Sequence, residues 1–441
     1  MFNWLLAWAK RYRRKSRVFP VRLRRIRPDR SAAEYIHSAY YRIRNDKLKH
    51  FMAEHPSSAE ERQYSRYRGM RRFRSWFVED VFAAAIRLVD ENWKIIHEIT
   101  GKGRWRQLAE MVWLSVYVPS MPENYYKFEW YQPSKRKMAT EYLHRYEMKN
   151  MLYSAIRASN EGNRYSFSNK RQFYMHAQKA GVPIPPMIAH VSQSRVDIFP
   201  PYDTRDVDFD LFMKPVSGKG GKGAVRFEWG GPDKPGFTSS AGKHFDTLEE
   251  ALTKYQKKGV RRRESYLVQP RVRTHSVLSD LTGEVASTCR IVVILNEKGE
   301  PEPVFASFRM PGDLHGVVDN AHDGGISSPV DLASGELGPG SYLGVAGDMS
   351  RHSTRKDNGA RIEGRKLPLW PETLSVVRKA HEAFSPTVLV GWDVCITDQG
   401  PIIVEGNAQP CTDVVQRRYG RPLSHDRFGE LLVYHVRRAF D

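Results

Sequence analysis

Cysteine is scarce in this 441-residue sequence, which has only Cys289, Cys395 and Cys411. Their spacing contains no CxxC or other pairing, which argues against a disulfide framework and against a zinc site. No apolar run approaches the roughly 20 residues that a membrane-spanning helix needs. The opening MFNWLLAWAKRYRRK places its apolar residues before its positive ones, in the reverse order of a signal peptide. We therefore expect a reducing, cytoplasmic setting.

The composition is that of a globular protein, with 40% hydrophobic and 27% charged residues. We see neither an internal repeat nor a low-complexity tract. The length allows two or three domains with cores of their own.

Positive charge is concentrated at the front of the chain. The formal net charge is +20, and residues 1–80 hold 21 Lys and Arg against 8 Asp and Glu. A basic segment of this kind can bind an anionic membrane surface, an acidic polymer or nucleic acid, although nothing here specifically indicates nucleic acid. A solvated helical face explains the same charges equally well. The apolar residues beside Arg11 and Arg13 resemble a short interfacial anchor, which would place the protein peripherally at the inner face of a membrane.

A helical region is predicted from residue 31 to about residue 156. In WFVEDVFAAAIRLVDENWKII, the residues Val78, Phe82, Ile86 and Val89 recur at helical spacing and form an apolar face. We interpret the Trp and Tyr residues of this region as core residues.

A glycine-rich loop follows the strand in DLFMKPVSGKGGKGAVRFEW. The strand ends at Lys214, and a second strand leaves through AVRFEW. Closely spaced glycines let main-chain N–H groups converge on an anion, so the loop is suited to covering phosphates, although a flexible hairpin loop is the plainer alternative. It is not a Walker A loop, because GK[ST] is absent. The candidate residues are Ser217, Gly218, Gly220, Gly221 and Gly223. Lys170 lies near the start of the preceding helix, where its positive charge is unfavourable for the helix dipole unless an anion is present.

Further along, a strand is predicted over residues 265–269 and a hairpin over STCRIVVILN and PVFASFR, with Arg290 pointing from one face. An arginine on a strand is usually structural. We predict that the Gly-, Asp- and Asn-rich connection at residues 313–338, with Asp319, Asn320 and Asp323, is a structureless functional loop.

A hairpin at residues 388–410, VLVGWDVCITDQGPIIVEGNAQP, is the strongest local signal. With the turn at TDQG, we expect Asp393 to lie opposite Glu405, and Asn407 to share the face of Glu405. Opposed carboxylates repel, so a cation between them is expected, and hard oxygen ligands suit Mg²⁺. Strand-end surface charges are the alternative. On the metal interpretation, Asp393→Asn should leave the metal-free fold as stable as before, or slightly more stable.

In this order the segments resemble the ATP-grasp superfamily, and in particular its sugar-transfer-associated branch related to α-L-glutamate ligases. FMKPVSGKGGKG and GWDVCIT…VEGNAQP carry the resemblance. It implies an α+β fold in which two α+β lobes clasp ATP, preceded by a helical, basic N-terminal region. The implied ranges are 1–30 (basic segment), 31–160 (helical region) and 161–441 (ATP-grasp domain, with lobes at about 161–275 and 276–441).

The resemblance also implies site roles and cofactors, ATP and Mg²⁺. Lys170 and Lys214 would hold the phosphates under the loop of residues 217–223, and Arg290 would steady charge on the transferred phosphoryl group, making Arg290 and Lys214 the catalytic residues. The metal ligands would be Asp393, Glu405 and Asn407. The adenine hinge would be Tyr266, Leu267, Val268 and Gln269. Gly391 departs from the pattern, because D-alanine ligases have an arginine at that position.

The implied activity is an ATP-dependent carboxylate–amine ligation through an acyl phosphate, releasing ADP and phosphate. The substrates would be an amine and a small-molecule or glycan-linked carboxylate, in polysaccharide or glycoconjugate biosynthesis. Two alternatives remain open: a kinase that phosphorylates a hydroxyl acceptor, and a basic membrane- or polymer-binding protein with an idle nucleotide site.

Overall fold

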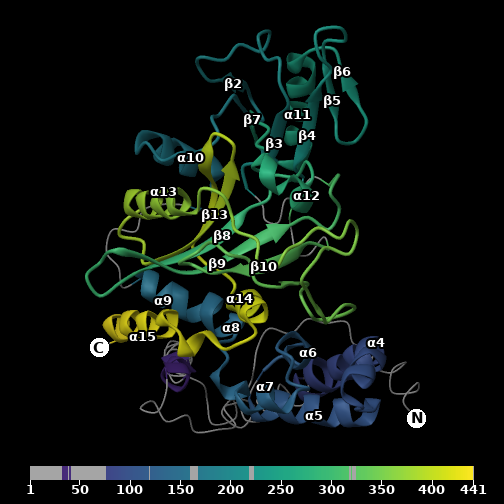
Figure 1. Cartoon of the computed structure of the whole chain (residues 1–441). Coiled ribbons are helices and arrows are strands. Elements are labelled where there is room, and N and C mark those ends of the chain that lie inside the picture. The colour runs from purple at the N-terminus through teal and green to yellow at the C-terminus, as the bar shows by residue number, and fades with distance from the viewer. Residues whose placement is uncertain are drawn as a thin grey trace, which may run out of the picture. The chain divides into compact units, whose positions relative to one another are not determined.

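The computed structural model describes residues 32–37, 39–40, 76–118, 120–158, 167–217, 223–316, 319 and 324–440 (Figure 1). The chain forms two compact units. Unit 1 contains Met1–Ser159, Ser341–Arg351 and Cys411–Asp441, and unit 2 contains Asn160–Gly340 and His352–Pro410. The first boundary lies beside the predicted one at residue 160. The grouping differs from the predicted ranges at the other end, because the final segment joins the helical region and not the ATP-grasp domain.

The described part of unit 1 is helical, as predicted. The apolar face of α4 packs against α5 and the aromatic segment after it, in a core that includes Ile86, Met111, Tyr126 and Trp130. Asn92 is fully buried on α4 and donates to the carbonyl of Val345, which ties Ser341–Arg351 to this helix. The elements are η1 (Trp76–Phe82), α4 (Ala83–Thr100), α5 (Arg104–Tyr117), α6 (Asn124–Lys127), α7 (Pro133–Lys137), η2 (Ala139–Glu141), α8 (Arg145–Glu147), η3 (Met148–Leu152), α9 (Tyr153–Ala158), α14 (Thr412–Tyr419), η6 (Leu423–His425) and α15 (Arg427–Phe440).

Unit 2 contains a first sheet with strand order β2-β1-β7-β3-β4-β5-β6. Helix α11 packs its apolar face on this sheet, because Ala251 and Tyr255 share a core with Leu211, Phe227 and Val268. The strands are β1 (Ala189–Val191), β2 (Val196–Ile198), β3 (Leu211–Pro215), β4 (Val225–Trp229), β5 (Phe237–Ser239), β6 (His244–Phe245) and β7 (Tyr266–Pro270), and the helices are α10 (Lys170–Lys179) and α11 (Leu248–Arg262).

The second sheet has the order β12-β11-β10-β9-β8-β13-β14, with η4 (Ser276–Leu278) and α12 (Ser279–Thr282) before it in the chain. Its strands are β8 (Cys289–Leu295), β9 (Pro301–Met310), β10 (Ile326–Val330), β11 (Gly340–Ser341), β12 (Arg351–His352), β13 (Leu389–Thr397) and β14 (Gly400–Asn407), and α13 spans Trp370–Ala383. The prediction that residues 313–338 are structureless is wrong at β10, where ISSPV pairs antiparallel with β9 despite Pro329.

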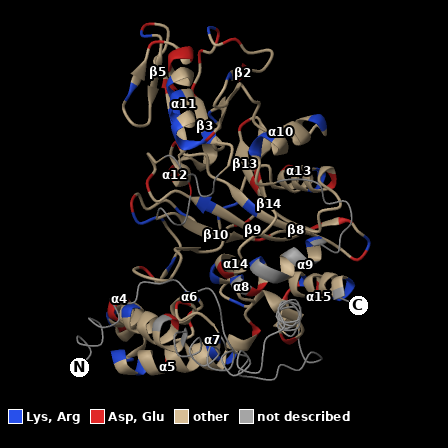
Figure 2. Cartoon of the chain, turned by 180° about the vertical axis from the view of Figure 1, so that it is seen from behind, with Lys and Arg blue, Asp and Glu red and all other residues tan. Residues whose placement is uncertain are grey.

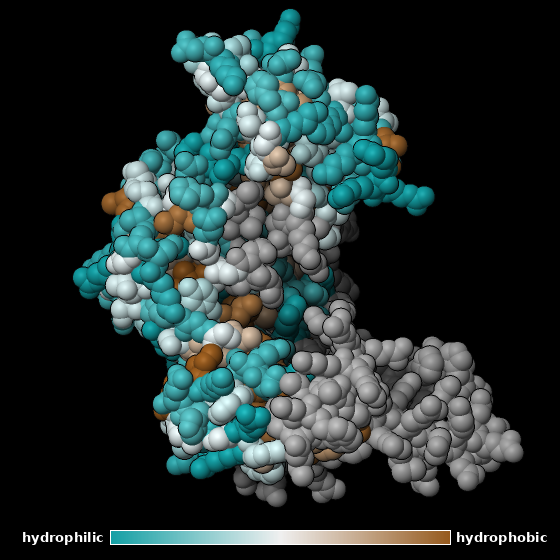
Figure 3. Space-filling model, turned by 90° about the vertical axis from the view of Figure 1, so that its right-hand side faces the viewer, coloured by the Kyte–Doolittle hydropathy of each residue, from teal (hydrophilic) through white to brown (hydrophobic). Residues whose placement is uncertain are grey.

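Aromatic side chains join α10, α13 and β13. Trp392 is fully buried on β13, and its ring lies 5.5 Å from Phe384 and 5.9 Å from Phe167 between ring centroids. Phe173 of α10 stacks on Phe384 at 5.1 Å. This cluster fixes α10, and therefore Lys170 at its first position, against the strand that carries Asp393. The surface in Figure 3 is largely hydrophilic where it is described, with hydrophobic residues in small separate patches.

We predict that Trp392→Leu lowers the free energy of unfolding by about 3 kcal/mol, because the smaller side chain leaves a cavity among three aromatic rings. Urea titration of the full chain measures the change. Trp113→Leu, at a position that is 55% exposed, is the matched control and should change stability little. Equal effects of the two substitutions would contradict this account of the core.

Candidate active site

Three opposed residues form a row across adjacent strands of the second sheet. Arg290 of β8 pairs with Asp393 of β13, which in turn pairs with Glu405 of β14. Side chains of directly opposed residues share one face of a sheet, and Asn407 shares that face by alternation along β14. The predicted opposition of Asp393 and Glu405 is confirmed.

A bulge in β14 sets this register. Thr397 pairs with Gly400 at the turn, and counting back from that pair would place Asp393 opposite Val404. The register instead shifts between Asp393 and Val394, which leaves Val404 as the extra residue. The carbonyl of Val404 accepts a hydrogen bond from the Tyr174 hydroxyl at 2.5 Å. A carbonyl at the bulge is therefore satisfied by a side chain from α10.

Two arginines hold Asp393. Arg290 donates from Nε to Oδ1 and from Nη2 to Oδ2, the latter at 2.6 Å, while Arg309 of β9 lies 3.3 Å from each carboxylate oxygen. Burial works to raise the pKa of Asp393, but the two guanidinium groups outweigh it and hold the pKa below its usual value. The positive charge expected beside this carboxylate is thus supplied, in this structure, by arginine.

Arg309, which the sequence pattern does not single out as a site residue, belongs to this cluster. So does Asp319, a partly buried carboxylate in the connection that the sequence predicts to be functional. Arg309 Nη1 lies 3.5 Å from the hydroxyl of Thr288, and Thr288 donates its N–H and hydroxyl to Asp319 Oδ2 at 2.8 and 2.6 Å. Burial raises the pKa of Asp319, and Arg309 opposes that rise. The alternation that singles out Arg290 applies equally to Arg309, but the bulge between Val292 and Val293 hides from the sequence which residues oppose each other.

The two predicted lysines both lie near Glu405. Lys214, at the end of β3, is 8% exposed and donates from Nζ to the Tyr174 hydroxyl at 2.7 Å. Burial lowers the pKa of Lys214 to about 8, and Glu405 opposes this shift. Lys170 begins α10, and its Nζ lies 3.9 Å from Glu405 Oε1. Burial lowers the pKa of Lys170 as well. Tyr174 was not predicted, because a buried tyrosine on a helix looks like an ordinary core residue.

The glycine loop is described only at its two ends, Ser217 and Gly223. The predicted residues Gly218, Gly220 and Gly221 lie outside the described residues, so the role of the loop stays a prediction. Gly223 has φ +81°, and a Cβ there would meet Pro215 Cγ at 3.1 Å. Both facts favour glycine where the chain leaves the loop.

The predicted hinge lies in the middle of the first sheet. Tyr266, Leu267 and Val268 are buried and pair with β1 on one side and β3 on the other. A strand paired on both sides turns its N–H and C=O groups toward its neighbours, so these three residues do not offer a main-chain edge to adenine. Gln269 is buried, and its amide donates to the carbonyl of Pro185 at 3.0 Å. The contact of this strand with adenine stays a prediction. Of the four predicted hinge residues, Gln269 is the best candidate to contact adenine.

The predicted metal ligands match Mg²⁺ in donor chemistry, because carboxylate and amide oxygens are hard ligands. The Glu405 side chain is 41% exposed, and Asn407 Oδ1 accepts the N–H of Gln409 at 2.9 Å. Within the described residues, no group of three or more His, Cys, Asp or Glu is gathered as a metal centre. Asp393 could join a metal ion only by exchanging arginine contacts for it. Its role, like those of Glu405 and Asn407, stays a prediction.

Gly391 explains how Arg290 reaches Asp393. A Cβ at Gly391 would lie 3.0 Å from Arg290 Cδ and 3.1 Å from Pro410 Cβ, so a side chain there would crowd the arginine. The chain therefore has no arginine at position 391, but Arg290 reaches Asp393 from the neighbouring strand β8.

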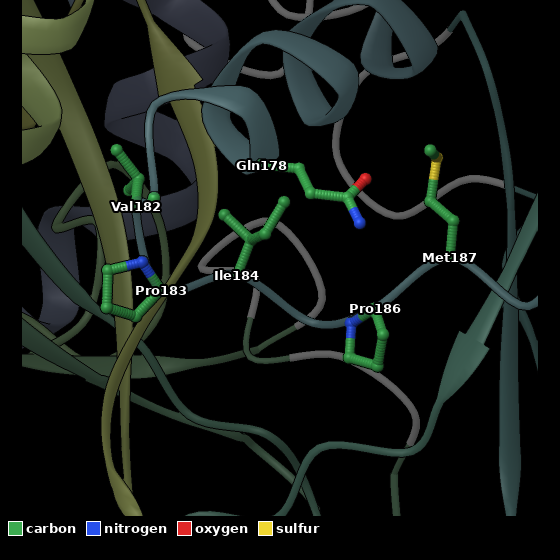
Figure 4. A pocket seen from close by; sticks show the side chains of 7 residues that line it. Gln178, Val182, Pro183, Ile184, Pro186 and Met187 are labelled. Atoms are coloured by element: carbon green, nitrogen blue, oxygen red, sulfur yellow. The ribbon is translucent and has the colours of Figure 1, made fainter. Parts of the chain in front are cut away.

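A separate groove of about 290 Å³ lies beside the C-terminal end of α10 (Figure 4). Figure 4 shows Gln178 above the extended segment that carries Ile184, Pro186 and Met187. The lining is mostly apolar and includes none of the predicted site residues.

Comparison with known proteins identifies the architecture as the ATP-grasp fold. The chain belongs to the family described as sugar-transfer associated ATP-grasp, whose profile matches residues 152–428. No curated protein sequence matches the chain.

Solved structures with partial similarity include two D-alanine–D-alanine ligases. The one from Bacillus anthracis has 13% identity and a TM-score of 0.35, over 66% of this chain and 70% of that chain. The one from Coxiella burnetii has 13% identity and a TM-score of 0.34, over 62% and 57%. An L-amino acid ligase from Bacillus licheniformis has 11% identity and a TM-score of 0.30, over 55% and 40%.

The structure reverses the expected stability of Asp393→Asn. Removing the carboxylate charge leaves two largely buried guanidinium groups without their partner, so we predict a loss of about 3 kcal/mol at pH 7. The pKa of Asp393 is lower in the folded than in the unfolded protein. The ionised carboxylate therefore adds to the free energy of unfolding above the unfolded pKa of about 4, and this stabilisation is lost as the pH falls toward the folded pKa. Urea titrations from pH 7 down to pH 3 measure both effects.

Asp233→Asn, at an exposed carboxylate, is the control for that experiment. If Asp393→Asn were as stable as the wild type at pH 7, the ion pair would not support the fold and the original expectation would stand.

Proposed function

We propose that the chain is an ATP-dependent carboxylate–amine ligase. In this reaction ATP phosphorylates a carboxylate, an amine displaces phosphate from the acyl phosphate, and an amide, ADP and phosphate are formed. The observation that carries the proposal is the gathering of Lys170, Lys214 and Glu405 beside the row of Arg290 and Asp393 in unit 2. Membership in the ATP-grasp family supports ATP as the phosphoryl donor.

The residues would act by position and charge. Lys170 and Lys214 would hold the phosphates of ATP, and the loop after Lys214 would cover them. Arg290 and Arg309 would stabilise negative charge that spreads over the transferred phosphoryl group, which is the main catalytic requirement of such transfers. Mg²⁺, held by Glu405, Asn407 and Asp393, would neutralise phosphate charge. Tyr174 would orient Lys214 through the hydrogen bond between them.

The substrates would be an amine and a carboxylate, either a small molecule or one linked to a glycan. The sugar-transfer association of the family supports a place in polysaccharide or glycoconjugate biosynthesis. Asp319, which accepts hydrogen bonds from Thr288, would lie on the acceptor side of the site.

Hydroxylamine trapping tests the reaction class. Purified protein incubated with Mg²⁺, ATP and a panel of carboxylic acids should release ADP and phosphate without AMP, and hydroxylamine should convert the acyl phosphate to a hydroxamate. Mass spectrometry detects the ADP and the hydroxamate. A phosphorylated product that is stable to hydroxylamine would establish the kinase alternative, whereas nucleotide binding without any turnover across the panel would favour an idle site.

Protonation of Lys214 provides a second test. ATP phosphates favour the charged lysine, so nucleotide binding should raise its pKa from about 8 and take up protons from solution at pH 8.5. Calorimetry with a non-hydrolysable ATP analogue in two buffers of different ionisation enthalpy measures this uptake. Lys214→Arg keeps the charge at every pH and should bind with less proton uptake. Equal uptake by the two proteins would remove Lys214 from the phosphate site.

A further inference from the structure

Helix α5 exposes large aromatic side chains on one face. Trp105 is 48% exposed, Trp113 is 55% exposed and Tyr117 is 42% exposed. We call these three residues the α5 face. At 100° per residue they span roughly 120° of the helix circumference, so they form one stripe and not a scatter. The sequence predicts that the Trp and Tyr residues of this region are core residues, and for the α5 face that prediction is wrong.

The buried side of α5 shows why the stripe faces outward. Leu108, Met111 and Leu114 pack into the unit 1 core and are at most 5% exposed. Trp113 and Tyr117 stack on each other with ring centroids 4.7 Å apart and an interplanar angle of 10°. The helix therefore has an apolar side in the core and, in addition, three large aromatic side chains that are partly exposed.

Helices α5 and α7 carry an excess of basic residues. Arg136 of α7 forms an ion pair with Glu110 of α5 at 2.7 Å, and Figures 1 and 2 both place α7 next to α5. Glu110 lies on the flank of the stripe beyond Tyr117, so α7 lies along that edge. Together α5 and α7 hold five basic residues and one acidic residue: Arg104, Arg106, Lys135, Arg136 and Lys137 against Glu110. Arg104 lies over the ring of Trp93 and Lys135 donates to the carbonyl of Gly420, so Arg106 and Arg136 are the two cations placed beside the stripe, where both pair with Glu110.

This combination matches the interface of an anionic bilayer. Trp and Tyr are favoured at the level of lipid headgroups, where their rings are half apolar and half polar, and Lys and Arg beside them attract anionic lipids. Other surfaces also use exposed aromatics, but a protein partner or a neutral glycan gives no reason for the excess of basic residues on α5 and α7. In the part of the chain that the structure describes, no helix is long and apolar enough to span a membrane. Attachment would then be to the surface.

We propose that the α5 face is a membrane-docking surface that lies in the headgroup region of an anionic bilayer, with α7 contributing electrostatic attraction. The Lys- and Arg-rich residues 1–80 belong to the same unit in sequence and would add to the attraction. The proposal concerns where the protein acts and does not depend on the ligase reaction.

Vesicle binding by the full-length protein tests the proposal. We expect co-sedimentation with phosphatidylcholine vesicles that contain phosphatidylglycerol, weaker binding to pure phosphatidylcholine, and a decrease as salt screens the charges. The triple variant Trp105→Ala, Trp113→Ala, Tyr117→Ala should lower the partition coefficient at least about tenfold. Brominated lipids should quench the tryptophan fluorescence of the wild type more than that of the variant.

The matched control replaces three exposed apolar residues of unit 2, Met175→Ala, Val260→Ala and Val277→Ala, which are 49%, 55% and 54% exposed. It should bind vesicles like the wild type. Circular dichroism melts and binding of the ATP analogue should be the same for all three proteins, which separates this test from that of the ligase function.

Two results would overturn the proposal. If the α5 triple variant bound vesicles as tightly as the wild type, attachment would belong to the basic N-terminal residues alone. If the wild type bound no vesicles at low salt but self-associated in sedimentation runs, and the triple variant did not, the α5 face would bind a second copy of the chain.

Discussion

The ion pair between Arg290 and Asp393 is the interaction on which the candidate site depends. Both groups are largely buried, and a buried charge is tolerated only when it is paired and hydrogen-bonded. The surrounding residues meet that requirement. Gly391 leaves room for the side chain of Arg290, and Arg309 approaches the same carboxylate from β9, the neighbour of β8. A bidentate guanidinium also fixes the orientation of the carboxylate, which a lysine in the same place could not do.

The bulge at Val404 connects this row to the lysines. By adding one residue to β14 it brings Glu405 opposite Asp393, and it directs a carbonyl to Tyr174, whose hydroxyl also accepts from Lys214. A single backbone irregularity therefore fixes the position of a carboxylate and, through Tyr174, of a lysine. Bulges are frequent beside active sites for this reason, because they redirect side chains without ending the strand.

Much of unit 2 could be predicted from the sequence. The hairpins followed from turn residues between alternating apolar runs. The TDQG turn brought Asp393 and the end of β14 together, but the exact opposition of Asp393 and Glu405 depends on the bulge at Val404, which the sequence does not reveal. The partners of Asp393 could not be predicted, because they depend on which strand lies beside β13 and on two bulges. The strand at Ile326–Val330 was hidden by Pro329 and by the glycines and aspartates before it. The exposure of Trp113 could not be predicted because periodicity identifies the stripe without showing which other element covers it.

We propose that the Arg290–Asp393 pair stabilises the candidate site and would be loosened by the binding of Mg²⁺ and nucleotide. A double-mutant cycle of Arg290→Gln and Asp393→Asn in urea unfolding measures their coupling directly. Without nucleotide we expect a favourable coupling of about 2 kcal/mol, within the range for a buried network. With saturating Mg·ADP the coupling should fall toward zero, because as a metal ligand Asp393 would exchange arginine contacts for the cation. A coupling that is unchanged by Mg·ADP would mean that the pair is purely structural and that Asp393 is not a metal ligand.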